Sequence, residues 1–151
     1  MTKLKVISMR IFKYIPNKLY GFTIDNDDFQ VFFHLGQFKP YKENGEVILS
    51  QPPPILGEPV VVSYYVSEDQ KKAPKAVNVE RVQRPKKLEG IVESYDHSRG
   101  YGFIMGEDGI SYHLHNSEIL NSRYPLQGEK VNFYAGIRLG KPRACHIEVI
   151  R

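Results

Sequence analysis

One short motif occurs twice in this chain, and this repeat constrains the fold more than any other feature. The segment Ser98-Arg99-Gly100-Tyr101-Gly102-Phe103-Ile104 has its counterpart 81 residues earlier, in Lys18-Leu19-Tyr20-Gly21-Phe22-Thr23. A second segment that ends at His115 has its counterpart at the same offset, ending at His34. The chain of 151 residues is therefore predicted to contain two related domains, each large enough to fold alone.

In each copy a basic residue precedes aromatic side chains that are spaced two residues apart. Successive side chains of a strand point to opposite faces, so residues with this spacing lie on one face. Exposed rings beside a cation form a surface on which nucleic-acid bases stack, with about 1–3 kcal/mol for each base. The pattern therefore favours single-stranded nucleic acid as the ligand.

Short segments rich in Val, Ile, Tyr and Phe, separated by turn-forming residues, predict an all-β protein. Two sets of five strands are expected, at 4–14, 20–24, 29–34, 60–66 and 76–82, and at 90–95, 102–105, 112–115, 130–137 and 144–150. Five short strands in a small domain are typical of a closed barrel. The glycines at 21, 100 and 102 would permit the curvature that closure requires.

The aligned copies divide the chain into a first domain at 1–82, a basic linker at 83–87 and a second domain at 88–151. The offset falls from 81 to 71 in the second half of each copy, because the first copy has about ten extra residues in its loop 39–54. This loop contains Asn44-Gly45 and three consecutive prolines. Surface loops of this kind either carry binding specificity or are tolerated insertions with a small hairpin of their own.

Charge and cysteine content limit the function classes. The net charge is +4, and the linker residues Arg84, Lys86 and Lys87 are predicted to contact phosphates. The single cysteine, Cys145, excludes an internal disulfide and a multi-cysteine metal site, and neither a metal nor a cofactor is expected. No signal peptide and no apolar run of about 20 residues is present, so a cytoplasmic protein without a membrane partner is expected.

The motifs resemble those of the cold-shock domain family, whose five-stranded OB-fold barrel carries two ribonucleoprotein-like motifs on its second and third strands. In the second half, Gly90-Ile91-Val92 and then Arg99-Gly100-Tyr101-Gly102-Phe103-Ile104 resemble the opening strand and the first motif. Tyr112-His113-Leu114-His115-Asn116-Ser117-Glu118-Ile119 resembles the second motif. In the first half, Lys18 to Phe22 is a degenerate first motif and Val31 to His34 is a good second one. The resemblance implies two tandem five-stranded OB-fold barrels.

Members of this family bind single-stranded RNA and DNA with low sequence preference, act as nucleic-acid chaperones or regulators of transcription and translation, and are not enzymes. Carried over by motif position, the binding residues are Tyr14, Lys18, Tyr20, Phe22, Phe32 and His34 in the first barrel, and Tyr95, Arg99, Tyr101, Phe103, His113 and His115 in the second. The intervening residues would face the core by strand alternation.

Several positions depart from the family pattern. Lys13 and Ser94 stand where the family has tryptophan, and His113 and Asn116 stand where phenylalanine is usual. Each missing ring removes stacking free energy of about 1 kcal/mol or more.

The sequence thus predicts a non-enzymatic protein that binds single-stranded nucleic acid, RNA more than DNA. The alternative is a protein-interaction module that docks on a transcription or translation protein, with nucleic-acid binding secondary; the weakened aromatic set favours it. A metal-dependent nuclease is disfavoured because clustered carboxylates are missing.

Overall fold

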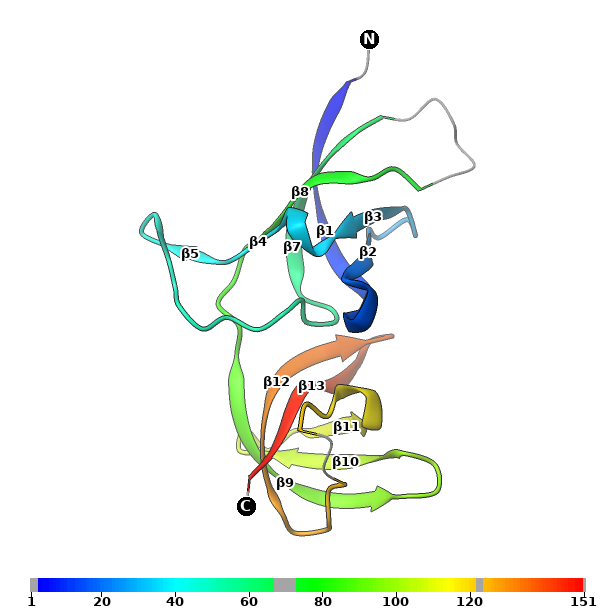
Figure 1. Cartoon of the computed structure of the whole chain (residues 1–151), viewed down its shortest axis with the longest axis vertical. Helices are drawn as coiled ribbons and strands as arrows, with labels where there is room; N and C mark the ends of the chain where they lie inside the picture. The colour runs from blue at the N-terminus through cyan, green and yellow to red at the C-terminus, as the bar shows by residue number, and fades with distance from the viewer. Residues whose placement is uncertain (1–2, 67–72, 122–123, 151) are drawn as a thin grey trace. The chain divides into compact units, whose positions relative to one another are not determined.

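The computed structural model describes residues 3–66, 73–121 and 124–150, and these form strands joined by turns and short 3-10 helices. The chain divides into two compact units, Met1–Arg84 and Pro85–Arg151, and each has its own cluster of buried hydrophobic side chains. Figure 1 shows the two sets of strands. The protein is all-β, as the sequence predicts. Among the described residues no helix is long and apolar enough to cross a membrane.

The second unit is a closed five-stranded barrel. Its strands are β9 (Lys87–Asp96), β10 (Tyr101–Gly106), β11 (Ser111–His115), β12 (Lys130–Arg138) and β13 (Lys141–Ile150), paired in the order β10-β11-β13-β12-β9. A parallel pair between β11 and β13 closes it, with His113 opposite Arg143. Alternate residues such as Ile104, Leu114 and Phe133 fill the inside and are fully buried.

The first unit is a curled six-stranded sheet in the order β3-β2-β1-β7-β8-β4. Its strands are β1 (Leu4–Ile15), β2 (Tyr20–Ile24), β3 (Gln30–His34), β4 (Phe38–Lys39), β7 (Pro59–Tyr65) and β8 (Ala76–Arg81). Two parallel contacts bring its ends together, Phe32 with Lys75 and Phe38 with Val79. The equivalent contacts in the second unit are His113 with Arg143 and Ile119 with Ile147. Both units therefore have the same strand arrangement.

The repeat extends to single cross-strand pairs. The matching pairs are Tyr20 with His34 and Phe22 with Phe32 in the first unit, and Tyr101 with His115 and Phe103 with His113 in the second. The opening strands also share a β-bulge, whose extra residue is Phe12 in β1 and Glu93 in β9. Bulges bend a strand and increase its twist, which suits the tight curvature of a small barrel.

The extra residues of the first unit form a hairpin of β5 (Lys42–Glu43) and β6 (Glu46–Val47). Its turn residues Asn44 and Gly45 both have positive φ, 53° and 81°, as in the Asn-Gly turns that favour tight hairpins. Within the part of the chain that the structure describes, this hairpin is a small sheet of its own. The chain after it returns through the three prolines to β7.

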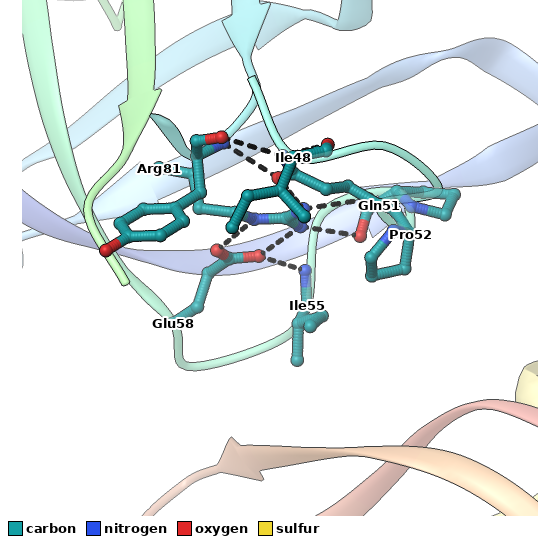
Figure 2. A network of polar contacts seen from close by, with 8 residues as sticks. Ile48, Gln51, Pro52, Ile55, Glu58 and Arg81 are labelled. Carbon is teal, nitrogen blue, oxygen red and sulfur yellow. Dashed lines mark hydrogen bonds and ion pairs between the residues drawn. The ribbon is translucent and has the colours of Figure 1, made fainter. Parts of the chain in front are cut away.

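A buried ion pair anchors the base of this loop (Figure 2). The guanidinium of Arg81 donates to both carboxylate oxygens of Glu58, at 2.7 and 2.8 Å, and to the carbonyl oxygens of Pro52 and Pro53, at 3.0 and 2.9 Å. It also lies over the ring of Phe38, 4.9 Å from the centroid. Arg81 and Glu58 are only 2% and 5% exposed, so the charges depend on one another.

The second unit repeats the backbone contact of this arrangement but not its arginine. Glu58 accepts a hydrogen bond from the backbone N–H of Ile55 at 2.6 Å, and Glu129 accepts the same bond from Leu126 at 2.6 Å. Val149, however, occupies the strand position that corresponds to Arg81. Arg81 is therefore a feature of the first unit, and it connects the inserted loop to the curled sheet.

Candidate nucleic-acid interface

Strands β10 and β11 carry adjacent rings on the outer face of the second unit. The ring of Tyr101 stacks on His113, with centroids 5.8 Å apart and planes at 27°. Phe103 meets the same imidazole edge-on at 5.6 Å, and His115 lies 6.5 Å from it. Phe103 remains 43% exposed, while the alternating residues between these rings are buried. The outer face of these strands is thus a row of accessible rings.

The first unit has the same surface with a more aromatic composition. Tyr20, Phe22 and Phe32 form a triangle with centroid separations of 6.4 Å between Tyr20 and Phe22, 5.3 Å between Tyr20 and Phe32, and 5.5 Å between Phe22 and Phe32. All three are half-buried, and His34 beside them is exposed. We name the two surfaces the first and second aromatic faces. The first consists of Tyr20, Phe22, Phe32 and His34, and the second of Tyr101, Phe103, His113 and His115.

His34 and His115 also have the same local role. Each precedes a short 3-10 helix, and its Nδ1 accepts a hydrogen bond from a backbone N–H, of Gly36 or Ser117, at 3.1 Å. An accepting Nδ1 places the proton of a neutral imidazole on Nε2. The turn therefore fixes the tautomer of both histidines and leaves Nε2–H as the donor.

Three cations border the second aromatic face, and none was among the predicted binding residues. A hollow of about 530 Å³ lies beside Phe103 and His113. It is also lined by Arg138, the last residue of β12, and by Lys141 and Arg143 at the start of β13. Arg138 and Lys141 are exposed, whereas Arg143 is only 6% exposed. The sequence did contain a signal for Arg143, because Pro142-Arg143 aligns with Pro74-Lys75 of the first copy.

The charge of the second aromatic face depends on these cations. Burial, and then the charge of Arg143, lowers the pKa of both His113 and His115 below 6.5. Both imidazoles are consequently neutral at pH 7, when they can stack as aromatic rings. The positive charge of this face comes from its arginines and Lys141.

Two predicted binding residues, Tyr14 and Tyr95, are half-buried against the hydrophobic cores. Tyr14 stacks on the buried ring of Phe33, with centroids 6.5 Å apart, and Tyr95 packs against the core of the second unit. Burial raises the pKa of both phenols. The bulge is the physical reason, because it puts two consecutive residues on the outside and so turns the next tyrosine inward. Tyr14 and Tyr95 therefore lie behind the two faces, against the cores.

The predicted basic residues are accessible, although most have carboxylate neighbours. Lys18 is exposed, and Arg99 donates to the hydroxyl of Tyr101 at 3.1 Å while lying 3.8 Å from the carboxylate of Asp96. Of the linker cations, Arg84 pairs with Glu43 at 2.5 Å, Lys86 lies 4.0 Å from Asp108, and Lys87 is exposed at the start of β9. Exposed pairs of this kind are weak, so these cations can exchange a carboxylate for a phosphate.

A second hollow, of about 730 Å³, has the opposite chemistry. It is lined by the exposed apolar side chains of Ile91, Met105 and Ile150, together with three carboxylates and one cation, Glu89, Glu93, Glu107 and Lys130. Met105 lies on the same side of β10 as Phe103, so this acidic surface adjoins the second aromatic face. Its three carboxylates make this surface unfavourable for phosphates.

No group of three or more His, Cys, Asp or Glu side chains within the described ranges is placed to hold a metal ion.

Comparison with known proteins agrees with this geometry. Residues 88–150 match the family model of the 'Cold-shock' DNA-binding domain, so the second unit is a cold-shock domain. The shared registers and closing contacts indicate that the first unit is a second, degenerate copy. Among solved structures, the chain is similar to drosophila Unr CSD456, with 16% sequence identity and a TM-score of 0.41. That alignment covers 100% of this chain and 63% of the other. No curated protein matches the sequence.

Proposed function

We propose that this protein binds single-stranded nucleic acid, RNA in preference to DNA, on the two aromatic faces and without catalysing a reaction. The observation that carries the proposal is the repetition of the same outer face, in the same cross-strand register, in both units. Two units that shared only their fold would need to repeat only the inner residues. Here the outer rings and the capping histidines are repeated as well. Membership of the second unit in the cold-shock family supports nucleic acid as the ligand.

Stacking supplies most of the affinity in this proposal. Each base that lies on a ring contributes about 1–3 kcal/mol, largely regardless of its identity. Arg99, Arg138 and Lys141 are the exposed cations at the second aromatic face. If they neutralise about three phosphates, the logarithm of the binding constant falls with the logarithm of salt concentration with a slope of about −2. This is a shallow dependence for a nucleic-acid-binding protein.

The preference for RNA is supported by the fixed histidines. The Nε2–H groups of His34 and His115 are donors held in place at the ends of the aromatic rows. A ribose 2′-OH can accept such a hydrogen bond, and a deoxyribose cannot. A protein of this type would act as a nucleic-acid chaperone or as a regulator of transcription or translation.

Fluorescence anisotropy of the full chain tests the proposal. The ligands are labelled oligouridine and oligothymidine of 4 to 16 nucleotides, with a duplex of the same length as control, each at two salt concentrations. We expect single strands to bind more tightly than the duplex, and a further gain when the oligomer becomes long enough to engage two linked sites. Binding that is absent below about 100 μM would contradict the proposal, since even non-specific nucleic-acid binding is commonly at or below this range.

A protein-interaction module is the alternative function, and the acidic hollow at Ile91, Met105 and Ile150 favours it. In that case a transcription or translation protein is the main partner and nucleic acid is secondary. The same titration separates the two functions, because the alternative expects no difference between single strands and duplex.

A further inference from the structure

Arg143 lies beside the second aromatic face and, unlike Arg138, is buried. It is 6% exposed, it lines the hollow beside Phe103 and His113, and its backbone lies directly opposite His113 in the parallel pair that closes the barrel. Its Nε is buried without a hydrogen-bond partner. The four ion pairs found among the described residues do not include it.

A buried donor without a partner is unfavourable. The Nε of Arg143 is such a donor, because it has lost its water without gaining an acceptor. Arg81 in the first unit shows the usual solution, since it is equally buried but donates to a carboxylate and two carbonyl groups. Arg143 lacks such acceptors, and Glu118, a nearby carboxylate, forms no ion pair with it within the described ranges.

We infer that Arg143 is a base-reading residue that selects guanine at the second aromatic face. This inference rests on the proposed function, and it adds sequence selectivity to a surface whose stacking is insensitive to sequence. An unpaired guanidinium matches the two acceptors O6 and N7 of guanine, which lie on one edge of the base and are bonded together by arginine. Adenine offers only N7 as an acceptor on this edge, next to an amino donor that repels the cation.

The position of Arg143 favours a base over a phosphate. The exposed cations Arg138 and Lys141 are on the rim of the hollow, where the strand's phosphates can remain in water. Arg143 lies deeper, beside the rings on which a base stacks. A flat base can enter the hollow edge-first and accept hydrogen bonds from the Arg143 guanidinium, including its buried Nε. Unlike a phosphate, the base brings no second full charge into the hollow.

The first unit lacks this feature. Lys75 stands at the position of Arg143, opposite Phe32, and it is exposed. A lysine is a point charge without the rigid planar fork of arginine, and an exposed ammonium group stays hydrated, so Lys75 is less suited to identify guanine. Selectivity is therefore expected from the second unit alone.

Binding of four octamers by the full chain tests the inference. They are octauridine and three derivatives with one central residue replaced by guanosine, adenosine or 7-deazaguanosine, the last of which lacks the N7 acceptor. The variants are Arg143→Gln and Arg143→Lys, with Arg138→Gln as a matched control on the rim. Thermal unfolding by circular dichroism establishes that each variant is folded. The Nε–Hε NMR signal that disappears in Arg143→Lys reports on Arg143 directly.

We expect the wild type to bind the guanosine octamer at least about fivefold more tightly than the adenosine and 7-deaza octamers. Arg143→Gln, which removes the cation, should remove this difference, and Arg143→Lys should reduce it. Arg138→Gln should weaken all four octamers alike. The Arg143 Nε–Hε signal should shift with the guanosine octamer more than with octauridine.

Equal wild-type affinity for all octamers would overturn the inference and leave the proposed function intact. An equal loss on all octamers in both Arg143 variants would also overturn it, because it would make Arg143 a phosphate contact. If no octamer binds at all, the proposed function fails and this inference fails with it.

Discussion

Replacing Arg81 by methionine should destabilise the first unit strongly and release its inserted loop. Methionine fills much of the same volume but leaves the carboxylate of Glu58 without its cation. Of the described hydrogen bonds to this carboxylate, one remains, from the backbone N–H of Ile55 at 2.6 Å. The carbonyl groups of Pro52 and Pro53 lose their donor at the same time.

The expected magnitude follows from burial. Removing one partner of a buried ion pair costs about 3–5 kcal/mol, because the other charge is left uncompensated. Neutralising both partners avoids this cost, so the double variant Arg81→Met with Glu58→Gln should be less destabilised than Arg81→Met alone. The exposed pair of Arg84 and Glu43 provides the matched control, since such pairs contribute about 0–1 kcal/mol.

Urea unfolding of the full chain, followed by hydrogen exchange, measures both effects. Arg81→Met should shift the transition of the first unit to lower urea and speed exchange in the hairpin of β5 and β6. The barrel of the second unit should keep its exchange rates. Arg84→Met should change the free energy of unfolding by less than about 1 kcal/mol. A loss in Arg81→Met no larger than in Arg84→Met would refute the reasoning, as would a double variant that is less stable than Arg81→Met.

Four further predictions concern backbone and pH. Leu19 has a left-handed backbone, with φ of 58°, at the position where the second unit has a glycine. Leu19→Gly should therefore stabilise the first unit by about 0.5–1 kcal/mol in urea unfolding. Unchanged or lower stability would contradict this. Gly102→Ala should destabilise the second unit by about 1–3 kcal/mol or more, because the added Cβ would lie 1.9 Å from the carbonyl oxygen of Ser94. Full stability would contradict this and show that the backbone at Ser94 can move away. His113 and His115 have folded pKa values below their unfolded value of 6.5, so the unfolded state binds more protons and stability should fall as the pH drops below about 6.5. Phosphates of a bound strand raise the same pKa values, so the affinity for octauridine should increase a few-fold between pH 7.5 and 5.5, and a pH-independent affinity would contradict their place at the interface.

The sequence predicted the ten barrel strands because each carries its own local pattern. Period-two alternation and turn residues place the strand ends within a few positions, and the internal repeat supplies the pairing that one copy alone would leave open. The Asn44-Gly45 hairpin was likewise visible as a local signal. The sequence did not show how Arg81 connects the inserted loop to the curled sheet. That contact depends on burial and on residues 23 to 30 positions away in the chain.

The candidate site was predictable only in part, for two physical reasons. Alternation placed the rings of β10 and β11 on one face. The motif position of Tyr14 and Tyr95 did not reveal that each follows a bulge and packs, half-buried, against a core. The cations Arg138 and Arg143 reach the rings through barrel closure, which brings β13 beside β11. Closure is a long-range property, and motif spacing does not contain it.

The most direct test of the central claim is the affinity of the full chain for octauridine when the second aromatic face loses its rings. Tyr101→Ala with Phe103→Ala should weaken binding at least tenfold, since each stacked base contributes about 1–3 kcal/mol. Met105→Ala is the matched control, because Met105 is 39% exposed on the same side of β10 but lies at the acidic hollow. Binding that is unchanged in the folded double variant, or equally reduced in Met105→Ala, would contradict the account.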